Sequence, residues 1–83
     1  MALIIPPRVA KELASVPRAV AKRLLSRLER IAEDPHAPQI GVKLLVGRAC
    51  VFRVRQGDWR AVYSIEDGEV IVDRIGHRTR VYR

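Results

Sequence analysis

The chain has 83 residues, of which 48% are hydrophobic and only 5% aromatic, and its formal net charge is +7. This composition excludes a disordered chain and predicts one small globular domain over residues 1–83 with an aliphatic core. The surplus of Lys and Arg predicts a polyanion or an acidic protein as the partner.

The location of the protein follows from its apolar runs and its cysteine content. The apolar runs are too short for a membrane span, and the start of the chain lacks the basic lead of a signal peptide. Cys50 is the single cysteine and stands among apolar neighbours, so we expect a buried thiol and no internal disulfide. These features predict a cytoplasmic protein that does not bind a membrane.

The first part of the chain predicts one short strand and two helices. Residues 2–5 are β-prone and are followed by two prolines, which suits a first or edge strand. Apolar residues then recur at helical spacing until Pro17, where a second helix begins. The apolar stripes of the two predicted helices consist of Val9, Ala10, Leu13 and Val16, and of Val20, Leu24, Leu28, Ile31 and Ala32.

The second part of the chain predicts a β-sheet. Asp34 to Pro38 contains two prolines and reads as a loop, and from Val42 the apolar period changes from helical spacing to two. Three strands follow, over residues 51–55, 59–65 and 70–75, and short turns join them into an antiparallel meander. We therefore predict an α+β fold in which the helical hairpin packs on one face of the sheet.

The first turn of the meander places several arginines together. With Gln56-Gly57 as a two-residue loop, Arg55 pairs with Asp58 and Arg53 pairs with Arg60. Because side chains alternate between faces, this register gathers the arginines on one face and directs Val54 and Trp59 into the core on the other. Like charges that face each other across strands repel, and a bound phosphate would relieve this cost. A solvated surface with an Arg55–Asp58 ion pair is the alternative interpretation.

The run KLLVGRACVFRVRQGDWRAVYSIEDGEVIVDRIGHRTRVYR resembles the RelE/ParE superfamily of bacterial and archaeal toxins. These toxins share the pattern K-L-x-G, then R-x-R-x-G-D-[YW]-R-x-x-Y, then a strand that ends in G-H-R-x-x-V-Y. The helical hairpin agrees as well, so the resemblance covers the whole chain. It implies a compact α+β toxin that a RelB-like antitoxin neutralises in a hetero-oligomer.

Within the RelE branch, the resemblance implies an endonuclease that cleaves mRNA in the ribosomal A site. Attack of a ribose 2′-OH on the adjacent phosphate needs a base, an acid and cations around the developing charge, but no metal or cofactor. The matching catalytic positions are Arg53, Arg60, Arg78 and Tyr82, with further RNA contacts expected from Lys43, Arg55, His77 and Arg80.

One departure from the family pattern concerns the proton acceptor. Family members often carry lysine at the positions of Arg53 and Arg55, and arginine stays protonated in proteins. The role of base therefore falls to Tyr82 or His77, while His36 is expected to be inert.

Two other functions stay open for this pattern. A ParE-like inhibitor of DNA gyrase shares the fold but is a binding protein without nuclease chemistry. A degenerate member would bind nucleic acid or its antitoxin without toxicity. On either branch we expect an acidic, amphipathic antitoxin segment that lies on the helical hairpin or adds a strand at a sheet edge.

Overall fold

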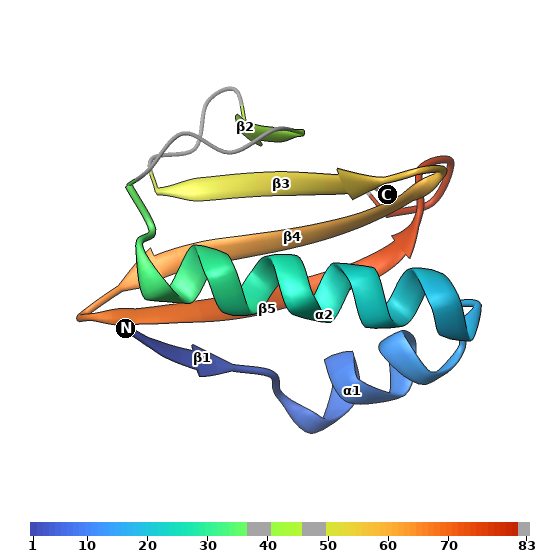
Figure 1. Cartoon of the computed structure of the whole chain (residues 1–83), viewed down its shortest axis with the longest axis horizontal. Coiled ribbons are helices and arrows are strands. Elements are labelled where there is room, and N and C mark those ends of the chain that lie inside the picture. The colour runs from blue at the N-terminus through green and yellow to red at the C-terminus, as the bar shows by residue number, and fades with distance from the viewer. Residues whose placement is uncertain (37–40, 46–49, 82–83) are drawn as a thin grey trace.

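The computed structural model describes residues 1–36, 41–45 and 50–81 and shows two helices packed on a mixed β-sheet (Figure 1). The sheet has the strand order β1-β5-β4-β3-β2. This arrangement confirms the predicted α+β fold. In chain order the elements are β1 (Ala2–Ile4), α1 (Pro7–Ala14), α2 (Arg18–Glu33), β2 (Val42–Leu44), β3 (Val51–Gln56), β4 (Trp59–Glu66) and β5 (Glu69–His77).

Prolines set the start of both helices. Pro7 occupies the first turn of α1, where a missing N–H costs nothing, and Pro17 is the residue that precedes α2. The stripe of α2 then points into the core, where Leu24 and Leu28 are fully buried. Most helix stability comes from this packing and not from intrinsic propensity, since neither helix has a side-chain cap.

The sheet combines the predicted meander with two outer strands. β3, β4 and β5 pair antiparallel in sequence order, and β2 adds to β3 in the same sense. β1 instead runs parallel to β5 and pairs only with residues 69–71. Pro6 and Pro7 explain the short pairing, because proline cannot donate to a ladder.

The predicted register of the first hairpin is wrong by one position in its loop. The loop is Gly57-Asp58, Gln56 faces Trp59, and Arg55 faces Arg60. Gly57 has a φ of 61°, the left-handed region that the first central residue of a type II′ turn requires. The predicted assignment of side chains to the two faces of the sheet is unchanged. Moving the loop by one residue shifts each strand partner by two positions, which leaves the alternation of side chains intact.

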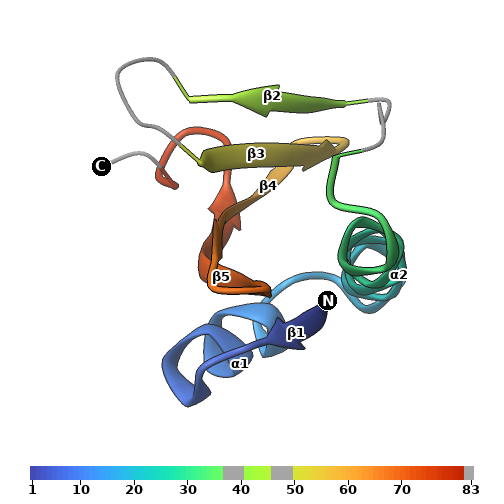
Figure 2. The same ribbon diagram turned by 90° about the vertical axis from the view of Figure 1, so that its left-hand side faces the viewer.

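α2 covers one face of the sheet, whereas α1 lies beside the edge of β5 and not, as predicted, on that face with α2 (Figure 2). The core lies between the sheet and these two helices. In Figure 2, α2 and the turn that follows β5 lie on opposite sides of β4 and β5. The covered face contributes Val54, Ala61, Tyr63 and Ile75, each 3% exposed or less. Phe52 stacks on Tyr63 with ring centroids 5.4 Å apart at the margin of this core.

The expected burial of Cys50 is wrong. Cys50 is exposed, and its φ of 60° places it in a left-handed turn that leads into β3. A side chain in that conformation stands outside the alternation of the strand, so its apolar neighbours in the sequence do not enclose it.

Within the described residues, no helix is long and apolar enough to cross a membrane.

Leu24→Ala should lower the free energy of unfolding by about 2–5 kcal/mol, because a fully buried side chain leaves a cavity. Leu44 is 57% exposed on β2, so Leu44→Ala should change the free energy of unfolding by less than about 0.5 kcal/mol. Urea denaturation of the two variants makes the comparison. Equal losses would contradict the assignment of the core to the helix-covered face.

Burial raises the pKa of Tyr63 to about 12, against a smaller lowering by the charge of Arg27. The folded state therefore keeps Tyr63 protonated at pH values where the unfolded chain releases the proton. The free energy of unfolding should fall as the pH rises from about 10 to about 12. Tyr63→Phe should flatten this dependence in urea titrations at pH 9 to 12, and parallel curves for the two proteins would contradict it.

Candidate nucleic-acid interface

The uncovered face of the sheet carries a cluster of cations in two adjacent rows. In the first row Lys43 faces Arg53 on the neighbouring strand, and Arg53 faces Val62, which faces Arg74. Neighbouring strands in a sheet are about 4.8 Å apart, and residues i and i+2 of one strand are roughly 7 Å apart. In the second row Arg55 faces Arg60, which faces Gly76. We call this cluster the arginine face; it consists of Lys43, Arg53, Arg55, Arg60 and Arg74.

The arginine face includes one residue that the sequence pattern does not reveal. Strict alternation along β5 would place Arg74 on the same side as Val72, which is buried in the core. A register shift opposite Val62 and Tyr63 leaves Asp73 as an extra residue, a β-bulge. The bulge moves Arg74 to the uncovered face, opposite Val62.

The backbone holds the cations of the second row in different ways. The guanidinium of Arg60 donates through Nη1 to the carbonyl of Gly57 at 2.7 Å and to that of Trp59 at 3.0 Å, so it lies along the hairpin turn. Arg55 is exposed, and its strand is secured by Arg27 of α2, whose Nη1 donates to the Arg55 carbonyl. Arg55 is thus the more accessible of the two for an arriving anion.

The turn that follows β5 borders the arginine face. Val81 is 4% exposed, and its Cβ lies 3.7 Å from the position that a Cβ on Gly76 would occupy. Arg74 donates through Nη1 to the Val81 carbonyl at 3.1 Å. These contacts fix the end of the described chain beside the second row of cations.

The partner of Asp58 differs from the predicted one. The Arg78 backbone N–H donates to the Asp58 carbonyl at 2.8 Å, and Arg78 Nε lies 3.4 Å from Asp58 Oδ1. The expected Arg55–Asp58 pair is therefore wrong, because Asp58 belongs to the turn and not to a cross-strand pair. Arg78 lies at the hairpin turn with an acidic neighbour.

His77 and Arg80 lie apart from the arginine face. His77 pairs with Trp59 on the helix-covered side, with ring centroids 5.5 Å apart in an edge-to-face arrangement, and its Nδ1 is 2.9 Å from Thr79 Oγ1. Together with Arg80 it lines a separate cleft at the edge of β5. Tyr82 lies outside the described residues.

The arginine face, as the described residues form it, carries no carboxylate, imidazole or phenol, and its four arginines stay protonated. In the same parts of the chain, no three His, Cys, Asp or Glu side chains gather so that they could hold a metal ion. The face can bind anions and stabilise negative charge, and any removal of a proton needs another group.

Residues 3–82 match the family model described as the ParE toxin of a type II toxin-antitoxin system, parDE. The chain belongs to this toxin family. A comparison with curated proteins gives no match. The family model confirms the resemblance to the RelE/ParE superfamily that the sequence motifs indicated.

Solved structures of RelE toxins share the fold of this family member. The archaeal RelE–RelB complex from Pyrococcus horikoshii matches with 27% identity and a TM-score of 0.78, over 96% of this chain and 97% of that one. The RelB–RelE complex from Methanococcus jannaschii matches with 21% identity and a TM-score of 0.79, over 95% and 94%. The isolated E. coli RelE toxin matches with 24% identity and a TM-score of 0.77, over 92% and 82%.

Asp58→Asn should strengthen the binding of polyanions, because it removes the carboxylate that lies beside Arg78. Both side chains of this pair are largely exposed, so stability should change by less than about 1 kcal/mol. Asp67→Asn removes the same charge from the turn between β4 and β5 and serves as the control. Later elution of Asp58→Asn alone from heparin would agree with the assignment, and equal elution of both variants would contradict it.

Proposed function

We propose that this toxin is a ribosome-dependent endonuclease that cleaves mRNA in the ribosomal A site. The observation that carries the proposal is the arginine face, on which five cations lie in two rows across three neighbouring strands and the adjoining edge strand. A row of guanidinium groups suits the phosphates of a single strand, because each group can contact a phosphate with two N–H donors.

The repulsion between opposed arginines in the unbound sheet favours the binding of an anion. Arg55 and Arg60 face each other across β3 and β4, and directly opposed like charges destabilise a strand pair. The bonds from Arg60 to the turn carbonyls reduce this repulsion without removing the charge. A phosphate between the two guanidinium groups would offset it and gain charge-assisted hydrogen bonds.

The proposed chemistry divides between binding and proton transfer. Arg53, Arg55 and Arg60 would hold the scissile phosphate and stabilise the charge that develops on it, and Arg78 would act at the leaving oxygen. Since arginine stays protonated, the proton of the attacking 2′-OH passes to another group. In this proposal that group is Tyr82, the residue that the family pattern places at the end of the chain.

Inhibition of DNA gyrase is the second candidate. The matching family model carries the name of the ParE toxin of parDE, whereas the solved structures reported above are RelE toxins. Gyrase binding needs a complementary surface and no reacting group. The opposed Arg55 and Arg60 favour the nuclease, because a pair of this kind suits one phosphate.

An antitoxin is part of the proposal on either branch. The similar structures from P. horikoshii and M. jannaschii are toxin–antitoxin complexes. We propose a cytoplasmic hetero-oligomer of this toxin with an acidic, RelB-like antitoxin, whose negative charge complements the net charge of +7. Binding would stabilise the toxin by mass action.

Cell-free translation tests the proposed cleavage. Primer extension on the translated mRNA should show breaks within A-site codons, and Arg55→Gln combined with Arg60→Gln should reduce the cleavage rate by about 100-fold or more. Arg23→Gln on the exposed side of α2 serves as the charge control. Thermal denaturation confirms that each variant is folded.

Two results would count against the nuclease. Intact mRNA together with gyrase-dependent DNA breaks would support the second candidate. Full cleavage by the double variant would show that the arginine face does not hold the phosphate.

A further inference from the structure

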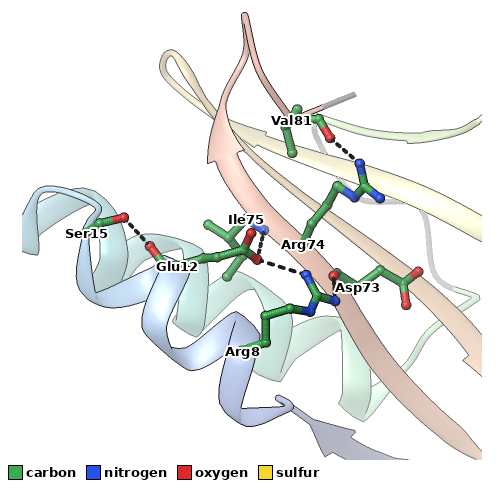
Figure 3. A network of polar contacts seen from close by, with 7 residues as sticks. All are labelled: Arg8, Glu12, Ser15, Asp73, Arg74, Ile75 and Val81. Atoms are coloured by element: carbon green, nitrogen blue, oxygen red, sulfur yellow. Dashed lines mark hydrogen bonds and ion pairs between the residues drawn. The ribbon is translucent and has the colours of Figure 1, made fainter. Parts of the chain in front are cut away.

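A cleft of about 610 Å³ lies at the edge of β5, between α1 and the turn that follows β5. Its volume falls in the range of small-molecule sites. Figure 3 shows the side chains of Arg8 and Glu12 from α1 meeting the backbone of β5, and Arg74 directed toward Val81. The cleft adjoins the arginine face, because Arg74 belongs to both and Gly76, the strand partner of Arg60, also lines the cleft.

The cleft exists because the strand that protects β5 ends early. Beyond Ile4 the chain turns into α1, and two side chains of that helix take the place of strand pairing. Arg8 donates through Nη2 to the Asp73 carbonyl at 2.8 Å, and Glu12 Oε1 accepts the Ile75 N–H at 3.2 Å (Figure 3). A carboxylate is thereby held in a fixed place at the sheet edge.

The orientation of Glu12 leaves acceptor capacity for a ligand. Its bond from the Ile75 N–H and its 3.8 Å contact with Arg8 Nη1 both involve Oε1. Oε2 has no hydrogen bond or ion pair with the parts of the chain that the structure describes. An ionised carboxylate can accept two parallel N–H donors.

The other walls of the cleft are cationic and aromatic. Arg8, Arg74 and Arg80 come from α1, β5 and the final turn, so three arginines line the cleft. Arg8 Nη1 lies 3.8 Å from the Glu12 carboxylate, whereas the guanidinium of Arg74 is directed toward Val81. The half-buried indole of Trp59 and the imidazole of His77 form a further wall. Cations for a phosphate, a ring surface and a fixed acceptor are the elements that recognise a nucleotide.

We propose that this cleft binds one nucleotide of single-stranded RNA, with its phosphate at the arginines and the edge of its base at Glu12. Guanine fits best, because its N1–H and N2–H donors lie side by side and match a carboxylate. The proposal rests on the proposed function, since a strand that crosses the arginine face reaches the cleft at Arg74. The cleft would then select the base next to the scissile phosphate.

Trp59 is the only tryptophan of the chain, and its fluorescence reports on the cleft. The probes are guanosine monophosphate, uridine monophosphate, inorganic phosphate and a glutamate-rich peptide. Guanosine monophosphate should change the emission in a saturable manner, with an affinity at least about tenfold above that of uridine monophosphate. One well-formed bidentate contact gives discrimination of this size.

Glu12→Gln identifies the selective group. The amide oxygen of glutamine can still accept the Ile75 N–H, which preserves the support of the sheet edge. The preference for guanosine over uridine monophosphate should fall to about one, while the affinity for uridine monophosphate stays within about threefold. Glu29→Gln, an equal change of charge on the exposed side of α2, should keep the preference. Thermal denaturation checks both folds.

Several results would overturn the proposal. These are the absence of saturable binding, equal affinity for inorganic phosphate and guanosine monophosphate, and an unchanged preference in Glu12→Gln. Tighter binding of the glutamate-rich peptide than of any nucleotide would assign the cleft to a protein partner. The Arg55→Gln and Arg60→Gln double variant separates the two proposals, because it should lose cleavage but still bind guanosine monophosphate at the cleft.

Discussion

The arrangement of the four arginines on the arginine face depends on β4, which is paired on both of its sides. Its ladder with β3 places Arg55 opposite Arg60, and its ladder with β5 places Arg74 opposite Val62. Ala61 and Tyr63 alternate with these positions and anchor the strand in the core. Because one side of β4 is buried, its register cannot slip without moving charge into the core. The strand pairing therefore keeps the arginines opposite each other despite their repulsion.

The β-bulge at Asp73 connects the fold to the candidate site. It changes the side to which β5 directs its side chains, so Val72 and Ile75 both face the helices while Arg74 faces outward. Bulges concentrate at sheet edges and beside functional sites, where they redirect a side chain. The same irregular stretch presents the Asp73 carbonyl and the Ile75 N–H to α1, which builds the cleft beside the arginine face.

Family membership and fold do not by themselves determine the activity. The chain belongs to a toxin family of type II toxin-antitoxin systems, and toxins of the RelE type share its architecture. The same scaffold serves different functions, and function depends on the groups that a site presents. Here these groups are one lysine and four arginines, and the guanidiniums of the arginines bind and stabilise phosphate but do not accept a proton.

The sequence by itself determined the α+β class, the prolines at the helix starts, and the separation of core residues from arginines along β3 and β4. These features follow from local periodicity and backbone chemistry. Only the tertiary structure decided which arginines face each other, that Asp58 pairs with Arg78, and that Cys50 is exposed. These depend on one turn position, one left-handed residue and one bulge, because each changes the alignment of distant segments without changing the hydrophobic pattern.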